Sequence, residues 1–492
     1  MAIDGDEARI DSAGMRAIRT RHNLTQLLVI GVGLANFCAV AETEPASRPN
    51  LLIVIADQWR YEAFGFADNP DVKTPNLDRL QSQSVHFINA VSGMPVCSPM
   101  RASFHTGQRP LTHGVFLNDV PLNPHAETLG KSLRASGYAT GYIGKWHVNG
   151  DGRSNFIPRE QRLGFDYWKV LECTHDYSNS FYYADGPEKL KWDGYDAIAQ
   201  TRDAQQYLRA HAKSPQPFAL VLAWGPPHDP YLTAPDKYRA LYDANSIALR
   251  PNVPESARNQ ARKILAGYYA HCTALDDCIG ELRRTLAESG LDENTLILFT
   301  SDHGDMLGSQ GLYKKQKPYD ESIRVPMLFH WPKGLGAKPR ALDAPINSED
   351  LMPTLLGLCH VPIPKSVEGL DYSNYMRGGR NPGDGATVIS CASPFGEFVR
   401  AAGGREYRGM RDTRYTFVRD LNGPWLLFDN RNDPYQTNNF VNLQAHAKLQ
   451  ARLDAALKRK LKSQHDQFLP GDAYIKKWGY TVDAKGTVPY TP

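Results

Sequence analysis

The stretch Leu51-Leu52-Ile53-Val54-Ile55-Ala56, followed directly by the polar pair Asp57-Gln58, decides the fold of this 492-residue chain. An uninterrupted apolar run that ends at polar residues is typical of a strand buried on both faces of a parallel sheet. Four further runs have the same character, at residues 139–143, 218–223, 296–300 and 325–330. Helical patterns separate several of these runs, among them residues 126–136 and 262–286. The sequence therefore predicts an α/β fold, with a large, mostly parallel sheet flanked by helices.

The pattern of the chain changes between residues 365 and 390, where the glycine-rich loop 378–385 interrupts it. Beyond this loop the sequence predicts short strands at residues 387–391, 398–401, 416–419 and 425–428, and then a helix over 443–461. Leu449, Leu453 and Leu457 are spaced to lie on one face of that helix. We therefore expect a main domain over residues 48–375 and a C-terminal subdomain over 385–480, built as a smaller antiparallel sheet with a helix.

Composition narrows the class of protein. The chain is 41% hydrophobic and 22% charged, which is enough for a large core and two domains. Its net charge of +3 is too small to indicate a nucleic-acid partner. The seven cysteines form no clear disulfide framework, so most of them are interpreted as core residues.

The first 41 residues are interpreted as a leader with a signal peptide. Acidic residues precede Met15, whereas three arginines follow it and lead into an apolar run at residues 27–40. Residues 39–41 read Ala-Val-Ala and match a signal-peptidase site, so we expect translation to start at Met15 and the mature chain to begin near Glu42. The apolar run is short and interrupted, which argues against a stable membrane span. The expected location is therefore secreted or periplasmic.

Polar residues follow four of the predicted strands. Open α/β sheets bind ligands beyond the carboxyl ends of their parallel strands. Here those positions hold residue types that bind metal ions or anions: Asp57 and Gln58, Lys145 and His147, His228, and Asp302 and His303. Lys145 and His147 are two positions apart, so in an extended segment their side chains point the same way. The sequence thus predicts a site for a metal ion or an anion at this edge of the sheet.

The motif Cys97-Ser98-Pro99-Met100-Arg101 predicts a helix N-terminus. Ser98 is a good N-cap, Pro99 a good first helical residue and Gly107 a good helix end. Cys97 would then lie where free N–H groups and the helix dipole favour an anion, with the fixed charge of Arg101 one turn further on. Taken alone, the pattern also fits a buried structural cysteine beside a turn.

Together these motifs resemble those of the sulfatase family. Residues 97–101 with Thr106-Gly107 resemble its maturation and active-site motif, and residues 137–147 match G-Y-x-T-x-x-x-G-K-W-H. Residues 301–308 resemble its second metal-binding strand end, and residues 427–434 its C-terminal signature. The resemblance spans about residues 49–461 and implies the alkaline-phosphatase-like superfold. It also implies that Cys97 is oxidised to formylglycine by a formylglycine-generating or sulfatase-maturating enzyme.

The resemblance further implies one divalent cation at the strand ends. Its ligands would be Asp57, Gln58, Asp302, His303 and the modified Cys97. Gln58 and His303 stand where many sulfatases have Asp and Asn, so the carboxylate charge is lower here. Calcium is nevertheless the first expectation, because it prefers oxygen ligands, with manganese or magnesium second.

The implied reaction is hydrolysis of a sulfate ester, in which the formylglycine hydrate supplies the nucleophile. The cation and Arg101 would orient the hydrate, and Lys145 and Lys315 would neutralise the sulfate. Lys314 and Lys317 are the nearby alternatives to Lys315. His228 would protonate the departing alcohol, and His147 would take the proton whose removal releases sulfate.

Export and polar, aromatic-rich insertions indicate a sulfated carbohydrate as the substrate. The residues expected to contact it are Trp59, Arg60, Asn118, Asp119, His175, Asp176 and Tyr231. Two alternatives stay open: a hydrolase of phosphonate or phosphate monoesters or diesters, and a choline- or arylsulfatase. A two-zinc phosphatase would need Ser or Thr at position 97, and a non-catalytic glycan-binding relative would have lost part of the site.

Overall fold

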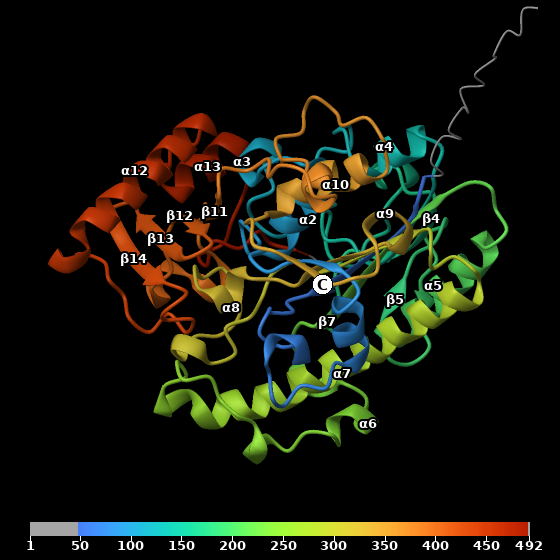
Figure 1. The fold of residues 1–492 in the computed structure, drawn as a ribbon, viewed down its shortest axis with the longest axis horizontal. Coiled ribbons are helices and arrows are strands. Elements are labelled where there is room, and N and C mark those ends of the chain that lie inside the picture. Colours follow the sequence, from blue (N-terminus) through green and yellow to red (C-terminus); the bar gives the residue numbers. More distant parts are fainter. Residues whose placement is uncertain (1–47, 491–492) are drawn as a thin grey trace, which may run out of the picture. The chain divides into compact units, whose positions relative to one another are not determined.

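The computed structural model describes residues 48–490 and is built around a mixed sheet with the strand order β10-β2-β9-β8-β1-β7-β3-β4 (Figure 1). These strands are β1 (Asn50–Asp57), β2 (Val85–Phe87), β3 (Ala139–Lys145), β4 (Tyr167–Leu171), β7 (Phe218–Pro227), β8 (Thr295–Ser301), β9 (Met327–His330) and β10 (Arg340–Leu342). The strand that opens the chain's apolar pattern, β1, lies at the centre and runs parallel to β7 and β8. The predicted α/β fold is confirmed.

The run at residues 325–330 forms β9, but the expectation that it is parallel was wrong. β9 pairs antiparallel with β8, because the chain returns to the sheet at the edge where β8 leaves it. Parallel pairing would require a crossover connection that carries the chain back to the other end of the strands. The returning segment holds only short helical pieces, including α8 (Asp320–Ile323). This return loop carries Asp302, His303 and Lys315 to the strand ends.

Helices cover both faces of the sheet (Figure 1). On one face, α1 (Pro75–Gln81), α5 (Asp196–His211) and α7 (Arg258–Glu288) pack on Leu52 and Val54. On the other face, α2 (Cys97–Thr106), α4 (Leu129–Ala135) and α10 (Leu351–Leu358) pack on Leu51 and Ile53. The predicted helices at residues 126–136 and 262–286 correspond to α4 and α7. The remaining elements of this part are α3 (Pro110–His113), β5 (Phe181–Tyr182), β6 (Leu190–Lys191), α6 (Asp236–Arg239), α9 (Pro332–Leu335) and α11 (Ser373–Met376).

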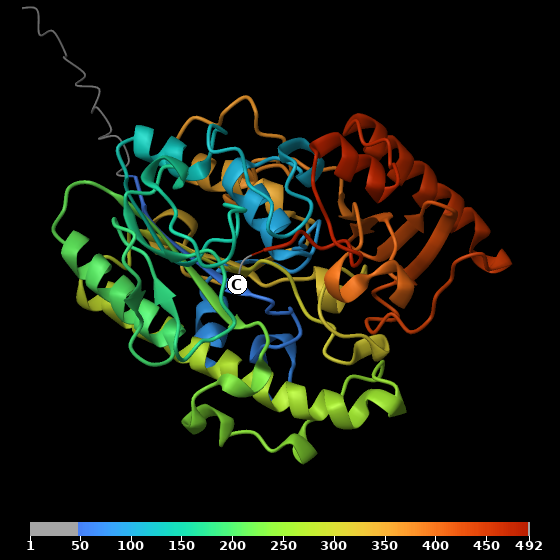
Figure 2. The ribbon, with the colours of Figure 1, turned by 180° about the vertical axis from the view of Figure 1, so that it is seen from behind.

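The C-terminal region forms an antiparallel sheet beside the main one, seen from behind in Figure 2. Its strands are β11 (Ala386–Cys391), β12 (Tyr407–Asp412), β13 (Tyr415–Asp420) and β14 (Gly423–Asp429), followed by α12 (Ala447–Ser463) and α13 (Gly471–Trp478). Leu453 and Leu457 of α12 pack on one face of this sheet. The opposite face packs on Val91 and Ile323 of the main part. The smaller sheet with its helix is confirmed, whereas the domain boundaries stay a prediction.

One strand of this small sheet was assigned to the wrong segment. Residues 398–401 form no strand but lie in 3-10 turns at Gly396–Phe398 and Arg400–Ala402. The strand that sequence reasoning missed is β12, because Arg408 and Arg411 make it read as an exposed segment. Both arginines are buried, and each is paired with a carboxylate, Arg408 with Asp466 and Arg411 with Asp320. Pairing of the charges is what permits their burial.

The described residues also bear on the cysteines and on membrane insertion. Within residues 48–490, the six cysteines are all buried and free, as expected of core residues. No helix in the same range is long and apolar enough to cross a bilayer. The expected leader and signal peptide, with Cys38, lie outside the described residues.

Candidate active site

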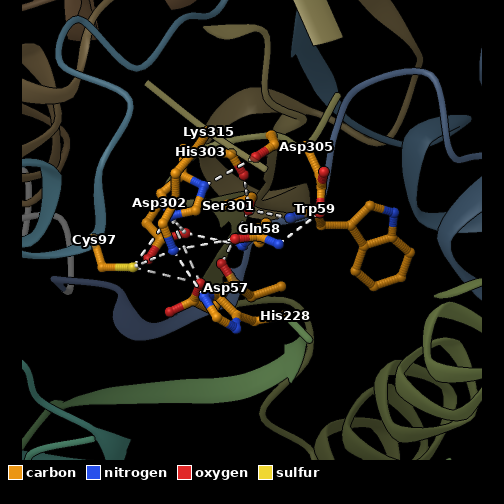
Figure 3. Close-up of polar contacts among 12 residues, drawn as sticks. Asp57, Gln58, Trp59, Cys97, His228, Ser301, Asp302, His303, Asp305 and Lys315 are labelled. Carbon is orange, nitrogen blue, oxygen red and sulfur yellow. Dashed lines mark hydrogen bonds and ion pairs between the residues drawn. The ribbon is translucent and has the colours of Figure 1, made fainter. Parts of the chain in front are cut away.

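Four strands deliver polar side chains to one point at the edge of the main sheet. β1, β3, β7 and β8 are parallel, so Asp57, Lys145, His228 and Asp302 meet beyond their carboxyl ends. Figure 3 shows Asp57, His228 and Asp302 of this group. The approach of β3 to β7 requires Gly144, where an added Cβ would lie 2.1 Å from the carbonyl oxygen of Ala223. The structure therefore brings together the strand-end residues that the sequence singled out.

Helix α2 begins at Cys97, and its first turn lies beside the strand-end residues Asp57 and His303. Ser98 is not the N-cap, contrary to expectation: the residue before the helix is Val96, which has an extended backbone. The Ser98 N–H donates to Oδ1 of Asn118 at 3.1 Å, so a neighbouring loop caps the helix instead. Gly107 ends the helix with a φ of 64°, as expected.

The thiol of Cys97 lies among charged groups. Its Sγ is 3.3 Å from Nζ of Lys315, 3.2 Å from Nε2 of His303 and 3.7 Å from Oδ1 of Asp57. Burial, reinforced by the charge of Asp57, raises the pKa of the thiol to about 12. At neutral pH the unmodified side chain is therefore a protonated thiol, which is a poor nucleophile.

Two carboxylates, an imidazole and Cys97 form a cluster that fits a cation. One ligand atom from each of Asp57, Cys97, Asp302 and His303 lies within 4.8 Å of the others. Nδ1 of His303 is 3.0 Å from the Gly304 carbonyl oxygen, so it carries the hydrogen and leaves Nε2 free to bind a metal. The outer carboxylate oxygens accept hydrogen bonds from Arg101, which leaves both Oδ1 atoms directed at His303. This donor set suits a divalent cation.

Gln58 turns the oxygen of its amide toward the cluster. Its Nε2 donates to Oδ2 of Asp305 at 2.6 Å, and its Oε1 accepts from Nζ of Lys315 at 3.1 Å. Tyr231 donates to the same Asp305 oxygen at 2.6 Å. The amide nitrogen is thus occupied, and the oxygen is available as a ligand. Sequence reasoning did not single out Asp305, which sets this orientation.

Arg101 contacts the carboxylates rather than the pocket. Its guanidinium donates to Asp302 at 3.0 and 3.2 Å, to Asp57 at 3.3 Å and to the Lys145 carbonyl oxygen at 3.0 Å. The side chain is completely buried. Arg101 therefore holds the two aspartates in place, and the expectation that it also orients the modified residue 97 stays a prediction.

Two lysine ammonium groups lie close to the sulfur of Cys97. Nζ of Lys145 is 2.6 Å from Oδ2 of Asp57 and 3.9 Å from Cys97 Sγ. Lys315 is the other, whereas the alternative Lys314 pairs with Asp229 and Lys317 donates to the Tyr313 carbonyl oxygen. The Coulomb attraction of Asp57, the largest effect after burial, helps to keep Lys145 charged by raising its pKa.

His228 is held as a neutral imidazole. Its Nδ1 is 2.9 Å from the Asp229 carbonyl oxygen, and its Nε2 accepts from Lys315 Nζ at 2.7 Å. Burial first, and then the charge of Lys315, keep the pKa of His228 well below its ordinary value. The ring of His175 stacks on it, with the centroids 4.7 Å apart. His228 and Lys315 therefore share one hydrogen-bonded proton beside Cys97.

Cys97, Lys145 and Lys315 line a pocket of about 290 Å³, together with His147 and His228. Asp57, Gln58, Arg101, Asp302 and His303 are buried and are bonded to these three residues or to one another. We call the eight residues Asp57, Gln58, Cys97, Arg101, Lys145, Asp302, His303 and Lys315 the pocket floor. The open end of the pocket is the pocket mouth, made of Asn118, Arg153, His175, Glu397, Thr487 and Tyr490. A larger hollow, of about 870 Å³, lies along α5 and α7 and contains none of these residues.

The residues expected to contact a substrate divide into two groups. Asn118, Asp119 and His175 line the pocket. Trp59 does not, because its indole is buried against Phe64 and points away from the cluster (Figure 3).

The other three expected contacts also lie off the pocket. The buried guanidinium of Arg60 is directed at the Met306 carbonyl oxygen. Asp176 caps its own turn by accepting from the N–H groups of Ser178 and Asn179, and Tyr231 is bound to Asp305 behind Gln58. The expectation of direct contact is therefore corrected for the buried Trp59 and Arg60, whereas for Asp176 and Tyr231 it stays a prediction.

Several pocket residues were not found from the sequence: Arg153, Asp229, Phe395, Glu397, Thr487 and Tyr490. They lie in loops far apart along the chain, and none belongs to a motif with a fixed spacing. The single usable signal was the sequence neighbourhood of Asp229, which directly follows His228.

Comparisons with known proteins agree with this geometry. The family model "Sulfatase" matches residues 49–361, and the model "N-sulphoglucosamine sulphohydrolase, C-terminal" matches residues 308–464. The chain is 42% identical over 458 residues to the ulvan-active sulfatase of Formosa agariphila, covering 92% of this chain and 88% of that one. It is 23% identical to the N-acetylglucosamine-6-O-sulfatase of Bacteroides thetaiotaomicron, covering 92% and 94% of the two chains. The solved structure of the sulfatase-family protein yidJ from Bacteroides fragilis superposes with a TM-score of 0.79 at 30% identity, covering 89% and 99%.

The mixed sheet, the strand-end cluster and the small C-terminal sheet define an alkaline-phosphatase-like hydrolase. Within that class, the chain belongs to the sulfatase family, as its motifs indicated, and is a sulfuric ester hydrolase.

Proposed function

We propose that this sulfatase hydrolyses a sulfate ester of a carbohydrate at the pocket floor, with residue 97 acting after oxidation of Cys97 to formylglycine. The observation that carries the proposal is the position of Cys97 Sγ, which lies within 3.9 Å of two lysine ammonium groups and of the imidazole of His303. As its hydrate, formylglycine supplies one hydroxyl for attack on sulfur and a second whose deprotonation allows sulfate to leave. The neutral thiol of the unmodified residue offers neither.

The residues proposed to hold a divalent cation are Asp57, Gln58, Asp302 and His303, together with residue 97. A bound cation would supply positive charge that polarises a sulfate oxygen and favours the ionised hydroxyl. Three of the four protein ligands offer oxygen, which supports calcium, with manganese or magnesium as the alternatives.

The remaining floor residues are proposed to bind the charge of the sulfate group. Both ammonium groups, of Lys145 and Lys315, lie within 3.9 Å of Cys97 Sγ, so both can reach an anion bound there. Arg101 fixes Asp57 and Asp302 and thereby keeps the cation ligands in position. His228 is proposed to transfer the proton it shares with Lys315 to the departing alcohol. His147 is proposed to accept the proton whose removal releases sulfate.

A carbohydrate substrate is supported by two observations. A relative named as an N-acetylglucosamine-6-O-sulfatase spans nearly the whole chain, and the relative at 42% identity is named for its activity on ulvan. The pocket mouth offers the amide of Asn118, the imidazole of His175 and the ring of Tyr490, which suit a polar ring.

Desulfation assays across a panel of sulfated mono- and oligosaccharides test this proposal, with an aryl sulfate and an aryl phosphodiester assayed in parallel. The expected result is turnover of at least one sulfated sugar, with kcat/KM on the phosphodiester well below that on the aryl sulfate. Faster turnover of the phosphodiester than of every sulfate ester would overturn it in favour of a phosphodiesterase.

Export and maturation complete the proposal. The leader at residues 1–41, with translation from Met15, is proposed to direct the chain out of the cytoplasm, and a formylglycine-generating or sulfatase-maturating enzyme is proposed to act on Cys97. N-terminal sequencing of the secreted protein should give a start near Glu42. A secreted chain that retains residue 1 would contradict the signal peptide.

A further inference from the structure

The carboxylate of Asp119 contacts the imidazole of His147. Nε2 of His147 is 3.2 Å from Oδ1 of Asp119. Arg153 binds the same carboxylate with two hydrogen bonds, from Nε to Oδ1 at 2.9 Å and from Nη2 to Oδ2 at 2.8 Å. Although burial opposes ionisation, the hydrogen bonds from Arg153 and His147 lower the pKa of Asp119. Asp119 is therefore an ionised acceptor.

This contact decides which nitrogen of His147 is basic. An ionised carboxylate accepts and cannot donate, so Nε2 of the neutral ring carries the hydrogen and Nδ1 keeps its lone pair. Nδ1 is buried and has no hydrogen-bond partner among residues 48–490. His147 lines the pocket, and its backbone φ of 59° lies in the left-handed region. The ring is thus presented with one unused basic nitrogen.

The C-terminal segment contacts Arg153, the residue that binds the Asp119 carboxylate. The segment after α13 runs back to the middle of the molecule (Figure 2). Tyr480 donates to the Gly114 carbonyl oxygen at 3.0 Å, and the Lys485 carbonyl oxygen accepts from Gly396 N–H at 3.1 Å. At its end, the Arg153 guanidinium lies 3.5 Å from the ring centroid of Tyr490. This contact is a cation–π interaction, and it stabilises the guanidinium in the position from which it binds Asp119.

The matches to the two family models end at residue 464, before this segment. It nevertheless supplies Thr487 and Tyr490 to the lining of the pocket.

We propose that Asp119, Arg153 and Tyr490 are positioning residues for His147, and that the C-terminal segment 479–490 is part of the catalytic pocket. Tyr490 holds Arg153, Arg153 holds the Asp119 carboxylate, and Asp119 fixes the imidazole with Nδ1 as the proton acceptor. The proposal rests on the proposed function for the role of that proton. The arrangement of the three side chains itself does not depend on formylglycine or a cation.

The first test reads the tautomer of His147 directly. In ¹⁵N-histidine spectra of the full chain with unmodified Cys97, the His147 signals are assigned by their loss in His147→Gln. We expect Nε2 to be protonated and Nδ1 to be unprotonated. Asp119→Asn tolerates the φ of 63° at this position and preserves the side-chain shape. The amide has one oxygen and no charge, so it cannot accept from His147 and from both nitrogens of Arg153 at once, and the fraction of the ring protonated at Nε2 should fall.

The second test measures turnover of the matured protein. Asp119→Asn should lower kcat by about 100-fold, within the range for loss of an acid–base group, with little change in KM. Tyr490→Ala should lower kcat by about two- to tenfold, because the cation–π contact of Arg153 is lost, while Tyr490→Phe retains the ring face and the rate. Tyr435→Ala is the matched control: its ring stacks on Arg250 at 4.9 Å outside the pocket, and its exposure of 36% is close to the 41% of Tyr490.

The outcomes separate this proposal from the proposed function. An unchanged tautomer in Asp119→Asn, or a loss in Tyr490→Ala no larger than that in Tyr435→Ala, overturns the positioning role. A wild-type protein that shows the expected tautomer but hydrolyses no sulfate ester overturns the proposed function and leaves the arrangement around His147 standing.

Discussion

The floor and the mouth of the pocket are built by different means. Floor residues come from the ends of strands, from the N-terminal half of α2 and, in the case of Lys315, from the return loop after β8, and every one is buried and bonded to another floor residue. Mouth residues come from loops and from the end of the chain, and Glu397, His175 and Tyr490 are exposed. The floor is therefore a buried network of bonded groups in which three cationic side chains outnumber two carboxylates, whereas the mouth is held by a few contacts with separate segments. Substitutions in the floor should affect every substrate, and substitutions in the mouth should discriminate between substrates.

The largest effect is expected at Cys97. Cys97→Ser should be nearly inactive on all sulfate esters, because serine cannot supply the second hydroxyl of the hydrate. The wild-type peptide that contains residue 97 should be lighter than the unmodified sequence and should react with hydrazides, as read by mass spectrometry. Protein in which Cys97 is shown to be fully unmodified and which turns over as fast as modified protein would contradict the mechanism.

Asp302 tests whether the floor holds a cation. Asp302→Asn should lower both cation affinity and kcat/KM by more than about 100-fold, because a charged ligand is lost. Asp302→Ala is a poorer choice, since an unpaired buried Arg101 would cost about 3–5 kcal/mol of folding free energy. Elemental analysis and the assay give the two readouts, and the melting temperature controls for folding. Full activity after chelation, with the metal shown to be absent, would exclude the cation.

His228 lies where floor and mouth meet, and its effect should depend on the leaving group. A sugar alkoxide needs a proton in the transition state, whereas a nitrophenolate leaves without one. His228→Ala should therefore lower kcat/KM on a sulfated sugar by about 100- to 10,000-fold and on nitrophenyl sulfate by much less. If both substrates lose rate equally, His228 only shapes its loop, and His147 becomes the candidate acid.

Gln58 tests how the charge of the floor residues affects calcium binding. Gln58→Asp adds a ligand charge, but it also places a carboxylate where the Gln58 amide now lies 2.6 Å from Asp305. The two like charges oppose each other, so the single variant should bind calcium no more tightly than the wild type. The double variant Gln58→Asp/Asp305→Asn removes the repulsion and should bind calcium more tightly by calorimetry. Tighter binding by the single variant would show that Asp305 does not set the orientation at position 58.

The smallest effect is expected at His175 in the mouth. Its ring stacks on His228 with an interplanar angle of 4°. His175→Ala should cost about two- to tenfold in kcat/KM on a sulfated oligosaccharide, in line with the usual contribution of a stacked ring pair, and less on nitrophenyl sulfate. Equal losses on both substrates would assign His175 to the floor instead of the mouth.

Sequence patterns were most informative where the chain itself imposes the geometry. The apolar runs could be assigned to strands because burial on both faces requires continuous apolar residues, and the ends of parallel strands necessarily meet at one edge. For this reason the strand pattern alone was enough to group Asp57, Lys145 and Asp302 at one site. The direction of β9 could not be derived, because a run of this kind is equally compatible with a return at the same edge.

The sequence by itself determined the class of fold, the strand-end cluster and the position of Cys97 at the start of a helix, because each depends on local pattern and fixed spacing. The tertiary structure alone decided which charged side chains are neutralised and what closes the pocket. Arg101 was expected to orient residue 97, and the structure pairs its guanidinium with two aspartates at the ends of different strands. Asp119, Arg153 and Tyr490 meet across more than 300 residues of chain, and no local pattern encodes such a contact. Burial of Arg101 and of Asp119 makes the pairing of their charges obligatory, since an unpaired charge in the interior costs several kcal/mol.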